Sequence, residues 1–140
     1  MPTSDPTTPI PEGWISVAEW MLSVYISGPI TADTPEQRDA NRKRGYLAAW
    51  KLLEYGFAIY CPHTVSVIVA AGQNPSDGDT TLPHNFIMPN DLFWVKTCDI
   101  ILMLPGYEKS IGCMAELRYA QQLGKQIYYN IEDLLQAELE

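Results

Sequence analysis

The chain has 140 residues and a formal net charge of −8, with 46% hydrophobic and 19% charged residues. This length is sufficient for one domain with a full core, and the acidic balance argues against a nucleic-acid polymer as a partner. A small anionic ligand remains compatible with the charge, because a helix N-terminus acts locally whatever the net charge.

The sequence also indicates in which compartment the protein is expected and whether it is expected to bind a cofactor. No apolar run approaches the roughly 20 residues that span a bilayer, so no membrane partner is expected. The first residues lack a basic segment followed by an apolar one, which predicts no secretory signal and a cytoplasmic protein. Cys61, Cys98 and Cys113 are an odd set without CxxC spacing, typical of buried reduced thiols. They form no metal constellation with His63 and His84, and no metal or other cofactor is expected.

The N-terminal segment differs in composition from the rest. Residues 1–13 are rich in Pro, Thr and Ser and are predicted to be a flexible arm, with residues 14–140 as one domain. Trp14 to Trp20 predicts a short helical turn. Two tryptophans this near the terminus favour a covered hydrophobic edge or a subunit interface over a ligand site.

Leu22 to Ser27 predicts the first strand, which runs into Gly28, Pro29, Ile30 and Thr31. A strand that ends in a glycine turn ahead of a helix is where an α/β fold lets backbone approach a ligand. Turn chemistry alone also accounts for the Gly-Pro pair.

A helix is predicted from Thr34 to about Tyr55, with Thr34 as N-cap, Pro35 at the first position and Gly56 closing it. We expect an apolar face toward the core, made of Ala40, Leu47, Trp50 and Leu53. The first half of this helix is polar and basic, which indicates a solvated face or, alternatively, neighbours of an anionic ligand.

Phe57 to Cys61 predicts a second buried strand, and His63 follows at its carboxyl end with either a site role or a structural one. Ser66 to Asn85 lacks clear periodicity and predicts a short helix followed by a loop of the length often found in lids. Phe86 to Lys96 predicts a helix that starts near Met88, with Pro89 in its first turn.

Cys98 to Leu104 is nearly continuous in apolar residues, as expected of a strand covered on both faces. Ser110 is the predicted N-cap of a helix that carries Glu116 and ends at Gly124. A fourth strand and a closing helix are predicted after it, at Gln126–Asn130 and Ile131–Glu140.

The alternation of strands and helices predicts a single-domain α/β fold of the flavodoxin or Rossmann kind. We expect a mostly parallel sheet of four to five strands with helices on both faces. The carboxyl ends of the first three strands would then bring together Gly28–Thr31, His63 and the loop at Ser110. That loop and the helix N-terminus after it, including Gly112, form a ready anion site.

Two carboxylates are predicted to face this cleft. Glu116 lies one turn into its helix, and Asp91 lies at the start of the preceding one. Such a pair breaks glycosidic bonds, one group attacking the anomeric carbon and the other protonating the leaving group. The alternative is that Asp91 caps a helix and Glu116 is an exposed helical acid.

Several segments in a specific order resemble the nucleoside 2-deoxyribosyltransferase superfamily, from Val24 to Ile131. They are YISGPI, NDL, the CD that ends eight residues after Asp91, LPG and SIGCMAEL. That superfamily includes base transferases, nucleoside 5′-monophosphate N-glycosidases and hydrolases of CMP or hydroxymethyl-CMP. The resemblance implies a small-molecule nucleotide substrate, no cofactor and, with the apolar Trp14–Trp20 segment, a homodimer.

The resemblance also implies residue roles. Glu116 would be the nucleophile and Asp91 the general acid/base, and Tyr25 and Gly28 would line the sugar and phosphate pocket. Ser110, six residues before Glu116, stands where the monophosphate-using members keep a phosphate-binding serine. Thr31 stands where some of them have an arginine, a contact for which Arg38 and Arg42 are the candidates.

The sequence therefore predicts cleavage of the N-glycosidic bond of a nucleoside 5′-monophosphate, either a deoxynucleotide or a pyrimidine nucleotide. Three alternatives stay open: a deoxyribosyltransferase that exchanges bases, a phosphoribohydrolase of the cytokinin-activating kind, and a nucleotide-binding sensor without turnover. The phosphoribohydrolase ranks lower, because that kind has a doubled glycine and GT where this chain has PGYEKSIG.

Overall fold

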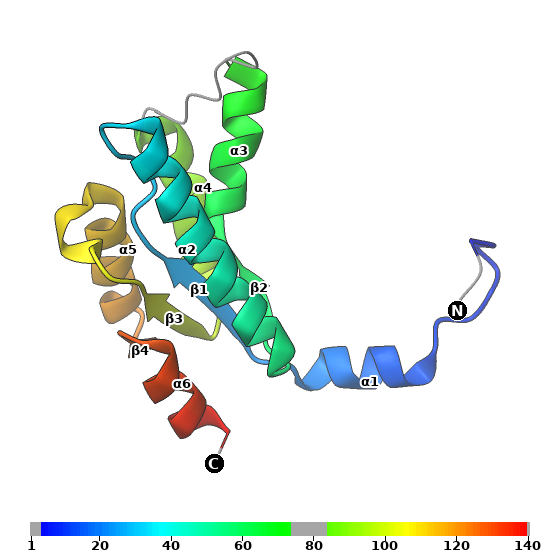
Figure 1. Ribbon diagram of the computed structural model, residues 1–140. Helices are drawn as coiled ribbons and strands as arrows, with labels where there is room; N and C mark the ends of the chain where they lie inside the picture. Colours follow the sequence, from blue (N-terminus) through cyan, green and yellow to red (C-terminus); the bar gives the residue numbers. More distant parts are fainter. Residues whose placement is uncertain (1–3, 74–83, 140) are drawn as a thin grey trace.

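The computed structural model describes residues 4–73 and 84–139, which build a four-stranded parallel sheet covered by helices (Figure 1). The strands lie in the order β2-β1-β3-β4, and every neighbouring pair is parallel. The predicted α/β fold is thereby confirmed. The strands are β1 (Ser23–Ser27), β2 (Ala58–Tyr60), β3 (Ile100–Met103) and β4 (Gln126–Tyr128).

Helices connect and flank these strands. They are α1 (Glu12–Trp20), α2 (Pro35–Glu54), α3 (Pro62–Gln73), α4 (His84–Thr97), the short 3₁₀ helix η1 (Tyr107–Lys109), α5 (Ile111–Gln122) and α6 (Ile131–Glu138). Both predicted N-caps are confirmed: the side chains of Thr34 and Ser110 accept hydrogen bonds from the backbone N–H groups of Gln37 and Cys113. Among residues 4–73 and 84–139, no helix combines the length and the apolarity needed to cross a membrane.

The order of the strands places a crevice next to β1. From β1 the chain goes outward to β2 and then crosses to β3 and β4 on the other side. Ser27 at the end of β1 lies beside Met103 at the end of β3. Ligands of open α/β sheets bind beyond the carboxyl ends of the strands at such a reversal, so this is where a site is expected.

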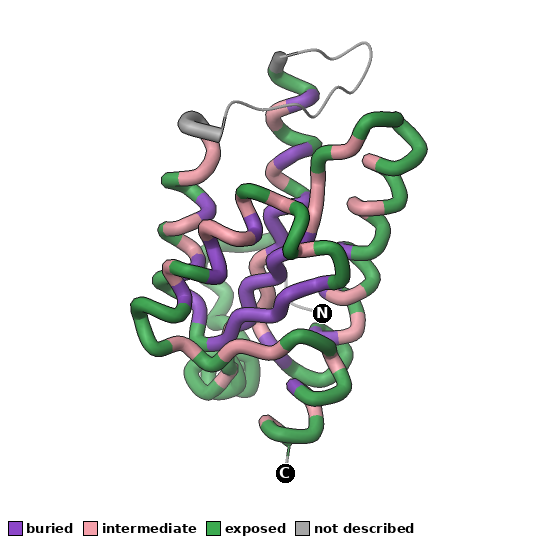
Figure 2. Tube along the Cα trace, turned by 90° about the vertical axis from the view of Figure 1, so that its left-hand side faces the viewer, coloured by how far each residue is buried: buried purple, intermediate pink, exposed green. Residues whose placement is uncertain are grey.

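Alternate residues of the strands face two separate core layers, since successive side chains of a strand point to opposite faces. Val24 and Ile26 of β1 pack in one layer with residues of α2 and α6. Tyr25 packs in the other with residues of α4 and α5, among them Val95 and Leu117. The helices therefore cover both faces, and the buried positions follow the strands (Figure 2).

The predicted core face of α2 is wrong. Leu47, Trp50 and Leu53 are 58%, 63% and 48% exposed, and Ala40 is also exposed. The buried residues of α2 are instead Gly45, Ala49 and Leu52. The segment LAAWKLL supports two adjacent apolar stripes, and the stripe of smaller residues faces inward because it allows a closer approach to the neighbouring elements.

His63 shows how close that approach is. A Cβ atom added at Gly45 would lie only 2.6 Å from the His63 ring, so α2 and α3 meet there at a distance that only glycine permits. The His63 ring is fully buried in this contact.

Three smaller predictions differ from the structure or fall partly outside the described residues. The β2 strand is only half-buried, because it lies at the edge of the sheet. The α4 helix starts at His84 rather than near Met88, so Pro89 lies inside the helix and Asp91 lies beyond its first turn. The helix predicted after Ser66 is part of α3, whereas the predicted loop at residues 74–83 lies outside the described residues.

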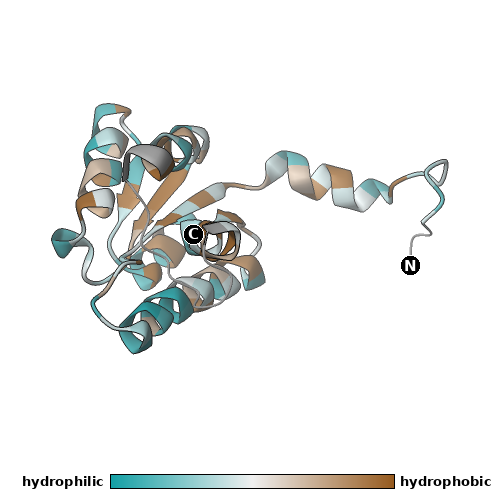
Figure 3. Ribbon diagram, turned by 90° about the horizontal axis from the view of Figure 1, so that it is seen from above, coloured by the Kyte–Doolittle hydropathy of each residue, from teal (hydrophilic) through white to brown (hydrophobic). Residues whose placement is uncertain are grey.

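The N-terminal segment extends away from the sheet. The predicted helical turn is confirmed as α1, which begins two residues earlier than Trp14 and has no buried residue. Figures 1 and 3 show α1 projecting from the body of the molecule, with residues 4–11 continuing beyond it.

The close contact at Gly45 predicts a loss of stability on substitution. Gly45→Ala places a methyl group against the His63 ring, and overpacking of this kind typically costs about 1–3 kcal/mol. Urea unfolding monitored by circular dichroism measures this cost. Gly72→Ala is the matched control: nothing lies within 4 Å of the added atom, and alanine is the better helix former. Equal destabilisation of both variants would contradict the packing explanation.

Candidate active site

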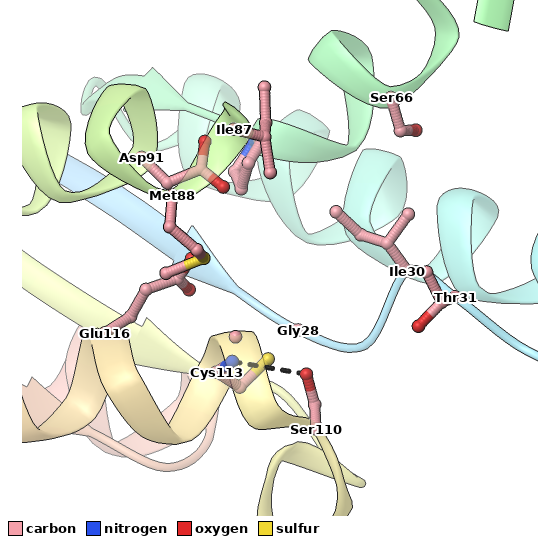
Figure 4. A pocket seen from close by; sticks show the side chains of 12 residues that line it. Gly28, Ile30, Thr31, Ser66, Ile87, Met88, Asp91, Ser110, Cys113 and Glu116 are labelled. Carbon is pink, nitrogen blue, oxygen red and sulfur yellow. Dashed lines mark hydrogen bonds between the residues drawn. The ribbon is translucent and has the colours of Figure 1, made fainter. Parts of the chain in front are cut away.

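A pocket opens at the carboxyl ends of β1 and β3 (Figure 4). Its walls come from the loop after β1, the start of α3, α4 and the first turns of α5. Twelve residues line it: Gly28, Ile30, Thr31, Pro62, Ser66, Ile87, Met88, Asp91, Ser110, Gly112, Cys113 and Glu116. The two predicted catalytic carboxylates therefore belong to one pocket.

Glu116 is buried at the base of this pocket, with 5% of its surface exposed. Two hydroxyl groups of β1 donate to its carboxyl group: Tyr25 Oη to Oε2 at 2.9 Å, and Ser27 Oγ to Oε1 at 2.7 Å. Tyr25 and Ser27 are two residues apart, so both point to the face of the sheet that α5 covers. The strand thus fixes the orientation of the carboxyl group.

Asp91 reaches the pocket from α4 and is also 5% exposed. Within the described residues, the neighbouring Asn90 donates a hydrogen bond to it, from Nδ2 to Oδ1 at 3.4 Å. Figure 4 shows Asp91 and Glu116 entering the pocket from two different helices. The alternative that Asp91 caps a helix and Glu116 is an exposed acid is excluded by this placement.

Burial shifts the proton affinity of both carboxyl groups. It raises the pKa of Asp91 to about 6, with the Asn90 amide acting weakly in the opposite direction. It also raises the pKa of Glu116 to about 8, and the charge of Asp91 adds to the effect, while Ser27 and Tyr25 oppose it. Both shifts disfavour ionisation of the two groups together near neutral pH, and their titration belongs to the pair rather than to one member.

The entrance to α5 offers hydrogen-bond donors to the same pocket. Ser110 Oγ accepts from the Cys113 N–H at 3.2 Å, which leaves the hydroxyl proton of Ser110 for a ligand. The first backbone N–H groups of a helix have no intrahelical acceptor, and Gly112 is among the lining residues. An anion at this end of the pocket would meet N–H groups and the positive end of the helix dipole.

The predicted ligand-binding residues fall into two groups. Gly28, Ile30, Ser110 and Gly112 line the pocket. Tyr25 does not line it, but is fully buried behind Glu116 and acts through its hydrogen bond.

Pro29 and His63 are also absent from the lining. Pro29 packs against the turn at Gly106. His63 lies in the first turn of α3 and packs on Gly45, with Nδ1 3.5 Å from Cys61 Sγ. Burial lowers the pKa of His63 to about 4, so it is neutral at physiological pH. Of its two predicted roles, this packing favours the structural one.

Sequence reasoning missed several residues of the site. Ser27 could have been found, because a polar residue two positions after Tyr25 must share its face of the strand. Met88 lies three residues before Asp91 on α4, a spacing that puts both on one side of a helix. Cys113 also lines the pocket. Burial raises the pKa of this thiol to about 11, so it stays protonated and is a poor nucleophile.

The raised pKa of Glu116 predicts a pH-dependent stability. The folded chain binds this proton more tightly than the unfolded chain, so the carboxyl group destabilises the fold increasingly as the pH rises from about 4.5 to about 8. Glu116→Gln removes the ionisable group, and we expect it to stabilise the protein by a few kcal/mol at pH 7.

Thermal unfolding of parent and variant between pH 4.5 and 8 measures this effect. The advantage of Glu116→Gln should shrink toward pH 4.5, where the unfolded chain also begins to hold the proton and the two states of the parent no longer differ in protonation. The exposed Glu108→Gln is the control and should leave stability unchanged across the range. An advantage that does not vary with pH would argue against a perturbed carboxyl group.

Comparison with known proteins places the chain in a family but assigns it no activity. Residues 22–129 match a family described as a domain of unknown function, DUF4406. None of the curated proteins matches the chain. The matched residues run from the start of β1 to just past β4 and include Asp91, Ser110 and Glu116. The chain therefore belongs to the DUF4406 family.

Proposed function

We propose that this protein hydrolyses the N-glycosidic bond of a nucleoside 5′-monophosphate, releasing the free base and the sugar phosphate. The observation that carries the proposal is the pair of buried carboxyl groups, Asp91 and Glu116, that line one pocket and whose pKa values burial raises. Glycosidic bonds are cleaved by two carboxyl groups held in different protonation states. The resemblance of the segments around both residues to the nucleoside 2-deoxyribosyltransferase superfamily supports the same assignment.

Glu116 is the nucleophile in this mechanism. Its carboxylate oxygen forms a bond to C1′ while the bond from C1′ to the base breaks, and Asp91 gives its proton to the departing base. Water then attacks C1′, Asp91 takes a proton from it, and the Glu116 carboxylate is released. Tyr25 and Ser27 donate hydrogen bonds to Glu116 and so favour its ionised form, which offsets part of the effect of burial.

The proton must lie on Asp91 when the first step begins. In the unliganded pocket Glu116 has the higher pKa, so this arrangement is the less populated of the two that contain one proton. A substrate that approaches Asp91 with a basic ring atom favours the required arrangement, because it accepts a hydrogen bond from the protonated carboxyl group. Binding of the substrate would therefore favour the arrangement in which the proton lies on Asp91.

The 5′-phosphate is assigned to the entrance of α5. Ser110 supplies a hydroxyl donor, and Gly112 lies in the first turn, where N–H groups are free. Thr31 adds a second hydroxyl among the lining residues. Of the two arginines considered as additional phosphate ligands, Arg38 donates to the carbonyl group of Ala32. Arg42 pairs with Asp39 through Nη2, while its Nη1 is buried without a hydrogen-bond partner among the described residues.

The deciding experiment measures free base released from a panel of ribo- and deoxyribonucleoside 5′-monophosphates and the matching nucleosides. We expect release from at least one monophosphate, and none from Glu116→Gln at equal protein concentration. A second series adds an acceptor base. Formation of a new nucleotide would identify the base-exchanging transferase, whereas binding without any release would identify a nucleotide sensor.

Asp91→Asn tests the role of the general acid. General acid catalysis contributes about 10²–10⁴ in rate, so we expect a loss of that size with natural nucleotides. A 4-nitrophenyl glycoside 5′-phosphate has a leaving group that needs no protonation, and its cleavage should fall far less. The ratio of kcat/KM for the two substrates is the readout. Equal losses with both would make Asp91 a positioning residue.

Ser110 variants test the specificity for a phosphate. Ser110→Ala removes one charge-assisted hydrogen bond, worth about 1.5–3 kcal/mol, or roughly a 10- to 150-fold loss in kcat/KM for the nucleotide. Ser110→Asp should be worse, because it repels the phosphate. Neither change should weaken cleavage of the unphosphorylated nucleoside. If the parent already prefers the nucleoside, the phosphate assignment is wrong and the transferase becomes the leading candidate.

A further inference from the structure

The apolar side chains of α1 are largely exposed in the described chain, although Val17 and Trp20 border a groove at its root. Trp14, Val17 and Trp20 are 59%, 61% and 85% exposed, and α1 contains no buried residue. A helix of nine residues is too short to be stable by itself in water, where even favourable sequences need roughly 12–15 residues. The helical state of α1 therefore calls for a surface that covers its tryptophans.

The outer face of α2 is the matching surface. Leu47, Trp50 and Leu53 are all about half exposed or more, although α2 is one of the main helices of the domain. Their spacing of three residues equals that of Trp14, Val17 and Trp20 on α1. Both stripes therefore extend about 9 Å along a helix, given a rise of about 1.5 Å per residue.

The two surfaces are connected and carry opposite charge. A groove at the root of α1 is lined by Trp20, Tyr55 and Leu139, so apolar surface continues from α1 past the end of α2. The α1 helix carries two glutamates and no basic residue, whereas α2 carries five basic and three acidic residues. Complementary charge favours the association of the two helices.

We propose that two copies of this chain exchange their α1 helices, so that the Trp14–Trp20 stripe of each packs on the Leu47–Leu53 face of the other. The contact is isologous, as in most homodimers. Trp14, Trp20 and Trp50 are 59%, 85% and 63% exposed, so the six side chains of the two copies would bury on the order of 800 Å² more, because a fully buried aromatic side chain covers about 150–250 Å². That is a large part of the roughly 1,600 Å² of a standard interface. Figures 1 and 3 show why exchange is favoured over packing within one chain, since α1 points away from α2.

Sedimentation velocity of the full chain between 1 and 100 µM tests the proposal, which is independent of the proposed function. We expect a dimer for the parent and at least 30-fold weaker dimerisation for Val17→Glu and for Trp50→Glu, the effect of losing an interface hot spot. Leu123→Glu replaces an exposed apolar residue at the end of α5, on the opposite side of the sheet, and should remain dimeric. A parent chain that sediments as a monomer overturns the proposal.

Mixing the two weakened variants distinguishes exchange from packing of α2 on α2. A mixed pair retains one intact contact, between α1 of Trp50→Glu and α2 of Val17→Glu. Exchange therefore predicts that the mixture dimerises more strongly than either variant alone, while α2–α2 packing predicts no rescue and no effect of Val17→Glu. Dilution of the parent should also shift tryptophan emission to the red as the exchanged helices separate, and Trp14→Phe with Trp20→Phe should remove most of that shift.

Discussion

The burial of the Glu116 carboxyl group against β1 is the interaction on which the rest of the site depends. Moving such a group out of water is costly unless it receives hydrogen bonds, and Tyr25 and Ser27 supply them from one face of the strand. Because α5 is held over β1 and β3 in this way, its N-terminus comes to the carboxyl end of β1. Burial at this place raises the pKa of Glu116, although the two hydrogen bonds act in the opposite direction.

The second carboxyl group is positioned by aromatic packing. Tyr60 of β2 stacks between Tyr25 and Trp94, with ring centroids 5.7 Å and 4.6 Å away. Trp94 belongs to α4, and Asn90 on the same helix donates to the Tyr60 hydroxyl at 3.0 Å. This stack links two strands to α4 and so fixes where Asp91 enters the pocket. Neither carboxyl group depends on a surface loop for its orientation.

The basic N-terminal half of α2 holds the loop that forms the pocket wall. Arg38 Nη1 donates to the carbonyl oxygen of Ala32 at 3.0 Å, and Asn41 Nδ2 donates to that of Ile30 at 3.4 Å. These bonds pair two carbonyl groups of an irregular segment, which has no regular backbone hydrogen bonds to satisfy them. The sequence left two interpretations of this polar face, a solvated surface or neighbours of a ligand. The contacts add a third role, which is to support the loop after β1.

The sequence by itself determined the order of strands and helices, the caps at Thr34 and Ser110, and the convergence of Asp91 and Glu116. These features depend on local patterns and on the general topology of parallel sheets. Tertiary structure decided the rest. The segment around Trp50 contains two adjacent apolar stripes, and the buried one is the stripe whose Gly45 packs on His63 and whose Ala49 and Leu52 pack in the core. A side chain's direction and its partners are set by elements distant in the sequence, which periodicity within one element cannot encode.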